Sequence, residues 1–199
     1  MNETNKNLPP PMGEKKLLIL QTIAEMLERP AAEKVTTALL AKQLNVSEAA
    51  LYRHFASKAQ MYEGLIEFIE SGVFGVIGQI EATEEAGLKQ AEMIVASLLR
   101  FAQKNRGLTR VLVGDALVHE NPRLQARINQ LLDRIEATLK QCLKIAIAQN
   151  ALLSSAHDAS AHANMLVCFT LGQWQRFVKS GFKEDPLAQW AAQWPLLAR

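Results

Sequence analysis

The sequence predicts an all-α protein with an N-terminal three-helix head, built on a helix-turn-helix, and a C-terminal helical bundle that forms a homodimer. Apolar residues recur at helical spacing along most of the chain, which indicates about nine helices and no convincing strand. Two short helices separated by a tight turn occupy residues 36–55, and each follows a residue that commonly caps a helix N-terminus. The last long helices are apolar on more than one face, which is typical of a helix that is deeply central or shared with a second subunit.

Length and composition limit the class of protein. The chain has 199 residues, of which 49% are hydrophobic and 6% aromatic, so it can bury a sizeable core in one or two modules. Its formal net charge of +2 permits binding to nucleic acid without establishing it. No apolar run reaches the length of a membrane span and no signal peptide precedes the first helix, so we expect a cytoplasmic protein. Cys142 and Cys168 are expected to be buried free thiols rather than a disulfide.

We divide the chain into a disordered arm at residues 1–13, which contains three consecutive prolines, a helix-turn-helix head at 14–57, and a helical body at 58–199. After a first helix at 14–28, the expected helices of the body span 58–80, 84–104, 108–118, 122–149, 160–179 and 186–197. Gly107 suits a helix C-cap, whereas Gly72, Gly75 and Gly78 either fray the end of the first body helix or allow it to bend. The fourth helix of the body carries a basic face that we interpret as solvated, made by Arg123, Arg127, Arg134, Lys140 and Lys144.

The most informative stretch of the sequence is the predicted helix-turn-helix. Thr36 or Thr37 caps its first helix, and Asn45 with Val46 makes the turn. Ser47 then caps a second helix predicted over 48–55, and Ser57 caps the long helix that begins at Lys58. In this arrangement the second helix fits the major groove of DNA while the first braces it against the backbone.

Residue types on the second helix suit contact with DNA. Leu51 and Phe55, four residues apart, are expected to face the core of the head. Alanines at 49 and 50 let the backbone approach base edges, and Tyr52, Arg53 and His54 supply donors for phosphates or bases. Composition alone would also allow an ordinary amphipathic helix here, but the tandem spacing of capped short helices argues against that interpretation.

The block T-T-A-L-L-A-K-Q-L-N-V-S-E-A-A-L-Y-R-H-F-A-S-K resembles the DNA-binding domain of the TetR family of bacterial regulators, most specifically in L-Y-R-H-F-A-S-K at 51–58. The resemblance implies a two-fold dimer that binds a palindromic site in double-stranded DNA. The residues expected to meet the DNA fall into three groups: Thr36, Thr37 and Ser47 anchor helix N-termini to the backbone, Glu48, Ala49 and Arg53 lie along base edges, and Tyr52, His54 and Lys58 contact phosphates.

Three further stretches resemble the nucleoid occlusion branch of that family: Leu65–Glu70, Asn105–Arg110 and Arg127–Ala137. This resemblance implies a nucleoid-associated division inhibitor that binds the C-terminal tail of the tubulin-like division GTPase FtsZ and blocks ring assembly over the chromosome. Phe68, Lys104 and Asn105 match the positions expected to hold the tail. On the sequence alone, a buried Phe68 and a solvated Lys104 remain an equally good interpretation.

The resemblance also implies that the terminal helices form a four-helix dimer interface, for which we nominate Leu166, Phe169, Trp174 and Phe177. Dimerisation agrees with the physics of the head, because a single helix-turn-helix makes few contacts. Two heads related by a two-fold axis read half-sites about 34–36 Å apart.

Other chemistry finds little support. His157 and His162 are five residues apart, and Asp158 with His162 lacks a third ligand, so we expect no metal site. His119 and Glu120 are interpreted as capping or solvated residues, and no constellation for catalysis stands out, so we expect neither an enzyme nor a cofactor. The alternatives left open are a ligand-responsive transcriptional repressor of the same fold and a helical adaptor that has lost DNA binding.

Overall fold

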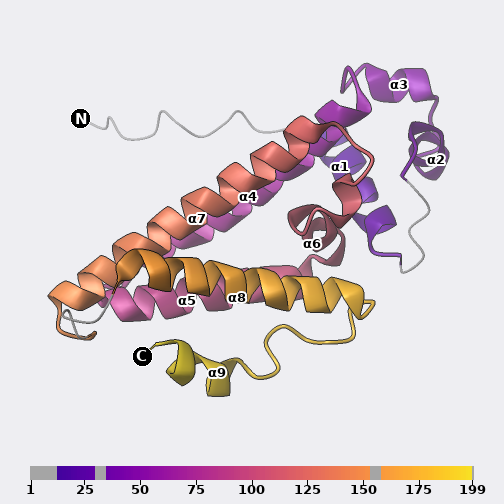
Figure 1. The fold of residues 1–199 in the computed structure, drawn as a ribbon. Helices are drawn as coiled ribbons and strands as arrows, with labels where there is room; N and C mark the ends of the chain where they lie inside the picture. Colours follow the sequence, from indigo (N-terminus) through magenta and orange to yellow (C-terminus); the bar gives the residue numbers. More distant parts are fainter. Residues whose placement is uncertain (1–12, 30–34, 153–157, 199) are drawn as a thin grey trace, which may run out of the picture.

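The computed structural model describes residues 13–29, 35–152 and 158–198, and within these ranges all regular structure is helical. The chain forms a head at one end and a longer helical body (Figure 1). Except for Gly13, the predicted N-terminal arm lies outside the described residues, as does the turn at 30–34.

Three helices form the head: α1 (Glu14–Leu27), α2 (Thr37–Gln43) and α3 (Glu48–Tyr52). The caps are local hydrogen bonds, in which Thr36 accepts from the amide of Leu39 at 3.2 Å and Ser47 accepts from that of Ala50 at 3.2 Å. Between them Asn45 adopts a left-handed backbone with φ of 54°, which closes the turn as predicted. Helix α3 ends at Tyr52, three residues earlier than expected, and is a single short turn-and-a-half of helix.

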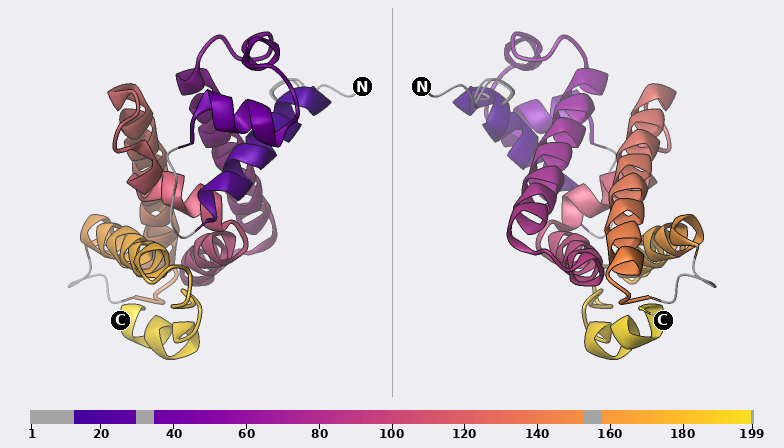
Figure 2. Two further views of the ribbon diagram at one scale, coloured as in Figure 1. Left: turned by 90° about the vertical axis from the view of Figure 1, so that its right-hand side faces the viewer. Right: turned by 90° about the vertical axis from the view of Figure 1, so that its left-hand side faces the viewer.

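The helices of the body pack as two crossed pairs. Helices α4 and α7 lie side by side and rise to the head, while α5 and α8 cross beneath them, and the C-terminal segment with α9 runs along α8 (Figures 1 and 2). The elements of the body are α4 (Lys58–Thr83), α5 (Gly87–Lys104), α6 (Arg106–Leu112), a 3₁₀ turn η1 (Asp115–Leu117), α7 (Pro122–Ala148), α8 (Ala159–Lys179) and α9 (Trp190–Leu197).

The helix predicted over 108–118 is in fact two elements, α6 and η1, because the backbone turns left-handed at Gly114 with φ of 77°. Helix α4 continues past Gly72, Gly75 and Gly78 to Thr83, so these glycines do not fray its end. The final helix begins at Trp190 rather than at residue 186.

Gly107 serves a different purpose from the predicted C-cap. It lies inside α6, where an added Cβ would stand 2.0 Å from the carbonyl oxygen of Ala24 on α1. Gly87 makes a similar close approach, since its Cβ would stand 2.3 Å from the carbonyl oxygen of Cys142 on α7. Only glycine permits these two helix crossings, because any side chain would meet backbone atoms.

The predicted solvated face of α7 is instead partly a row of contacts with α4, which we call the α4–α7 seam. Its contacts are the ion pairs Glu63–Arg123 and Glu70–Arg127, both at 2.8 Å, and the guanidinium of Arg134 at 3.9 Å from the Phe74 ring centroid. Because these arginines lie at intervals of four and seven residues, they follow one side of α7. The seam joins the helix that leads to the head with the longest helix of the body.

Candidate nucleic-acid interface and partner groove

Helix α3 presents one side to solvent and the other to the core of the head. Leu51 and Phe55 are buried, as predicted, whereas Glu48, Ala49, Tyr52 and Arg53 are exposed and His54 is half-buried. Figure 2 shows α3 at the far end of the head, away from the body. The second short helix of the motif therefore offers polar side chains outward from a fixed support.

A hydrogen bond joins the two short helices at their N-termini. The hydroxyl of Thr37 donates to Oε2 of Glu48 at 2.6 Å, which holds that carboxylate against the start of α2. Thr36, one residue earlier, makes the cap. The two threonines thus have separate roles, since one orders the first turn of α2 and the other orients Glu48.

Lys58 differs from the exposed residues of α3. Its ammonium pairs with Oε1 of Glu120 at 2.5 Å, and the side chains are only 24% and 12% exposed. Glu120, which the sequence suggested was capping or solvated, therefore connects the body to the first residue of α4. Arg53 by contrast makes no ion pair with any residue of the described ranges.

A surface hollow of about 390 Å³ lies where α1, α4 and α6 meet, and we call it the partner groove. Phe68, 43% exposed, and Asn105 both line it, and Lys104 is exposed one residue away. The structure therefore shows that Phe68 is not a core residue. The complete lining is Leu17, Leu20, Gln21, Ala24, Glu25, Glu28, Leu65, Phe68, Asn105 and Leu108.

The sequence analysis missed the side of the partner groove that α1 forms. Leu17, Gln21, Ala24 and the C-cap residue Glu28 recur at helical spacing along one face of α1. The apolar spacing of α1 predicts Leu17 and Ala24 as core residues, but both are only half-buried and line the groove. Glu25 and Glu28 are exposed, and no cation among the described residues pairs with either. One wall of the groove is therefore acidic, and the exposed Lys104 precedes the lining residue Asn105.

The structure corrects the residues nominated for the dimer interface. Leu166, Trp174 and Phe177 are buried in the core of the protomer itself, and the indole of Trp174 donates to the carbonyl of Leu98 at 3.1 Å. Phe169 is half-buried beneath Trp190, with ring centroids 6.2 Å apart. The face of α8 that remains open carries Met165, Cys168 and Gly172.

Helix α8 has two apolar faces. One packs on the core of the protomer and the other is exposed, and the residue types alone do not show which face is which. Cys142 is buried as predicted, and burial raises the pKa of its thiol to about 11. Cys168 is exposed, contrary to prediction, because it lies on the open face. A second surface hollow, of about 420 Å³, opens between α7 and α8 beside Leu132, Leu171 and Gly172.

The metal candidates do not assemble in the described part of the chain. His157 lies outside that part, and Nε2 of His162 lies 2.6 Å from the carbonyl oxygen of Leu197. No group of three or more metal-ligating side chains occurs among the residues described. In the same residues, no helix is both long and apolar enough to span a membrane.

Known proteins share both the fold and the head. Residues 19–65 match the family model for bacterial regulatory proteins of the tetR family, and residues 85–199 match that for the tetracyclin repressor-like C-terminal domain. The fatty acid degradation regulator FadR from Bacillus halodurans has the same fold, with a TM-score of 0.77 at 16% identity over 97% of each chain. PfmR from Thermus thermophilus has a TM-score of 0.72 at 19% identity, over 91% of this chain and 97% of its own. The chain is therefore a helix-turn-helix regulator of the TetR type.

Sequence relatives narrow this class. The nucleoid occlusion factor SlmA of Alteromonas mediterranea is 47% identical over 176 residues, which cover 88% of this chain and 90% of the relative. That of Vibrio cholerae is 47% identical over 185 residues, covering 90% and 92%. The chain belongs to the SlmA family of nucleoid occlusion factors, which confirms the fold, the TetR resemblance and the predicted branch.

Proposed function

We propose that this protein is a sequence-specific DNA-binding homodimer that acts on the nucleoid, binds the C-terminal tail of FtsZ, and blocks assembly of the division ring over the chromosome. The observation that carries the proposal is the division of α3 and the turn that follows it, residues 48–55, into a buried side, Leu51 and Phe55, and an exposed polar side. In a helix-turn-helix, a helix exposed in this way is the one that enters the major groove. Membership of the SlmA family supports nucleoid occlusion as the process in which this DNA binding takes part.

In this proposal the DNA contacts divide by chemistry. Thr36 and Ser47 fix two helix N-termini whose backbone amides are directed toward phosphates, and Thr37 orients the carboxylate of Glu48. Glu48, Ala49 and Arg53 lie along base edges, where carboxylate and guanidinium groups discriminate between bases. The backbone contacts of Tyr52, His54 and Lys58 set the register of the helix but carry no direct sequence information.

The partner groove is the proposed site for the FtsZ tail. Its floor is apolar, with Leu20, Leu65 and Leu108 beneath the exposed ring of Phe68. Asn105 offers an amide at the edge, although its Nδ2 already donates to the carbonyl of Phe101 at 2.8 Å. An extended segment with an apolar side chain for the floor and an acidic residue for Lys104 fits this lining.

The dimer uses the open face of α8 in this proposal. Met165 and Cys168 are exposed there, and Gly172 lets a second helix approach closely, since nothing in the protomer lies within 4 Å of the position of its Cβ. An exposed apolar strip on a long helix is a typical self-association surface. Two-fold pairing on this strip presents two copies of α3 to one duplex.

Selection of bound duplexes from a random pool tests the proposal. We expect the recovered duplexes to share a palindrome with half-sites about one helical turn apart. Recovery of no enriched sequence at low salt would contradict sequence-specific binding. Enrichment of a single half-site without symmetry would contradict the dimer.

A further inference from the structure

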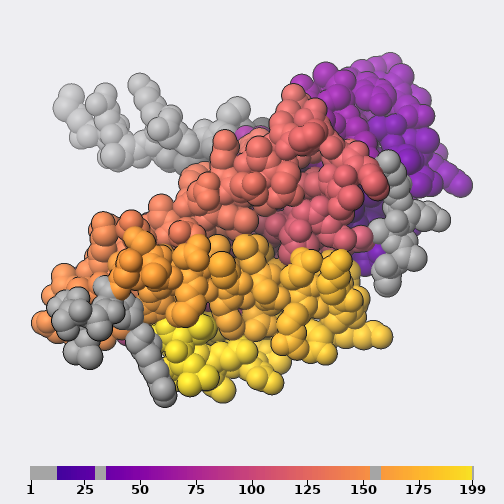
Figure 3. Space-filling view, in the orientation of Figure 1, coloured from indigo at the N-terminus to yellow at the C-terminus, as the bar shows by residue number. Residues whose placement is uncertain are grey.

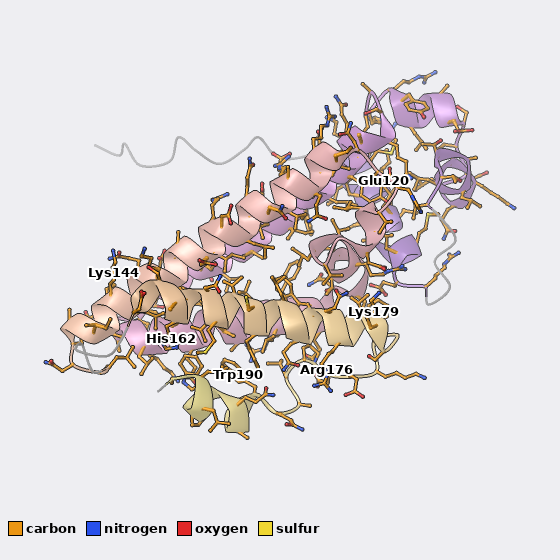
Figure 4. All side chains as sticks on the ribbon, in the orientation of Figure 1. Glu120, Lys144, His162, Arg176, Lys179 and Trp190 are labelled. Carbon is orange, nitrogen blue, oxygen red and sulfur yellow. The ribbon has the colours of Figure 1, made fainter. Side chains whose placement is uncertain are left out.

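The first residue of α4 has a partner that its expected role does not explain. Lys58 stands directly after the helix-turn-helix, where an ammonium is placed for a DNA phosphate, yet it pairs with Glu120 at 2.5 Å. Glu120 belongs to the body, just before α7, and Figure 4 shows it at the junction between head and body. Both side chains are largely shielded from solvent, so loss of either partner would leave the other as a poorly hydrated charge.

The Lys58–Glu120 pair lies beside the buried aromatic ring of Tyr62. Tyr62 lies one turn further along α4, and the ammonium of Lys58 stands 5.5 Å from the centroid of its ring. Burial raises the pKa of Tyr62 well above its ordinary value, the nearby charge of Glu120 raises it further, and Arg110 lowers it. Glu120 and Arg110 therefore act on the same buried ring from nearby positions.

Arg110, the other cation that acts on Tyr62, is already engaged. Its guanidinium contacts Asp115 at 2.6 Å and donates to the carbonyl of Leu27 at 3.2 Å. A carboxylate that loses its lysine in a shielded site is a costly unpaired charge. Separation of Lys58 from Glu120 therefore carries a free-energy cost.

We propose that Glu120 is a positioning residue for DNA binding, which holds Lys58 against the body in the free protein and is displaced by a DNA phosphate in the complex. This inference rests on the proposed DNA binding. The phosphate contact of Lys58 then has to separate an existing ion pair, so the free energy of DNA binding includes that cost. Because phosphates are common to all duplexes, the cost is the same for specific and random DNA.

The test is a double-mutant cycle on duplex affinity, measured by fluorescence anisotropy with a selected and a random duplex. Glu120→Gln removes the competing charge, and we expect it to tighten binding to both duplexes about three- to ten-fold. The same substitution in a Lys58→Ala background is expected to have no effect, because no ammonium remains to be released. Lys58→Ala should therefore cost more in the Glu120→Gln protein than in the wild type.

Glu63→Gln is the matched control, since it also removes one negative charge that pairs across from α4, by breaking the Glu63–Arg123 pair at 2.8 Å. It should leave duplex affinity unchanged, whereas a gain equal to that of Glu120→Gln would indicate a general charge effect and overturn the inference. Persistence of the Glu120→Gln gain without Lys58, or weaker binding by a folded Glu120→Gln protein, would also overturn it.

If Glu120→Gln unfolds, Glu120→Asp, which has a shorter reach, is expected to tighten binding about two-fold. Failure of the wild type to bind either duplex would instead contradict the proposed function.

Discussion

Arg53, the C-cap residue of α3, is an exposed cation with no ion-pair partner in the described ranges, and its side chain is free to meet a base edge. We predict that Arg53→Ala lowers affinity for a selected duplex by about 1–3 kcal/mol and changes affinity for random duplex far less. Competition binding with the two duplexes measures the difference. Lys58→Ala is the comparison, since it should weaken both duplexes by a similar factor. Equal losses on both duplexes for Arg53→Ala would assign that residue to the phosphates.

Phe68 has an exposed ring at the edge of the partner groove, so its removal should affect binding more than folding. We predict that Phe68→Ala weakens the affinity for an FtsZ tail peptide by about 2 kcal/mol while the unfolding midpoint in urea changes little. Leu196→Ala is the control, because Leu196 is an exposed apolar residue on α9 outside the groove. A large loss of stability without loss of peptide binding would identify Phe68 as a packing residue.

At the residue scale, the sequence predicted what depends on near neighbours. The caps of Thr36, Ser47 and Ser57 were predictable because each side chain bonds an amide three residues ahead. The partner of Lys58 was not, because Glu120 lies 62 residues away along the chain. The acidic wall of the partner groove was not predictable for the same reason, since its position depends on how α1 crosses α4.

At the scale of the elements, two glycines with opposite surroundings test the packing. We predict that Gly107→Ala destabilises the protein by about 1–3 kcal/mol, because its Cβ would collide with the backbone of Ala24 on α1. Gly75→Ala should stabilise by up to about 1 kcal/mol, since nothing lies within 4 Å of its Cβ and alanine favours a helix. Denaturation in urea measures both. A tolerated Gly107→Ala would contradict the close crossing of α1 and α6.

Helix existence was predictable from periodicity, whereas the roles of faces were not. The arginines of α7 carry the same pattern whether they are solvated or paired, and only the position of α4 places Glu63, Glu70 and Phe74 opposite them. From the local sequence, Gly107 after Asn105 predicts the end of a helix. In the structure Gly107 lies in the first turn of α6, where the backbone of α1 approaches it closely. Such assignments depend on which helices become neighbours.

At the scale of the whole molecule, the proposed dimer pairs through the exposed strip on α8. Figure 3 shows α8 crossing one broad face of the body, with the C-terminal segment beneath it. We predict that Met165→Glu converts the dimer to a monomer at micromolar concentration, because Met165 is 44% exposed on that strip and would place a charge in the interface. Leu196→Glu, at a residue 62% exposed on α9, is the control and should leave the dimer intact. Sedimentation velocity distinguishes the two, and an unchanged Met165→Glu dimer would place the interface elsewhere.

The α4–α7 seam explains how a body that dimerises can hold two heads in register. Ion pairs and the stacked Arg134 fix α4 against α7, and α7 packs on α8 more extensively than on any other helix. In the proposed dimer, the interface on α8 therefore determines how the two copies of α3 lie relative to each other. The partner groove shares a helix with the α4–α7 seam, since α1 and α4 form its walls.

In the proposed function, one molecule binds DNA through α3 and holds the FtsZ tail in the partner groove. The most direct measurement is the anisotropy of a labelled FtsZ tail peptide titrated with the full chain bound to a selected duplex. We predict saturable binding that Phe68→Ala weakens by about 2 kcal/mol and Leu196→Ala preserves, with the duplex still bound in each case. Tail binding that is absent on the DNA-bound wild type, or unaffected by Phe68→Ala, would contradict the proposed function.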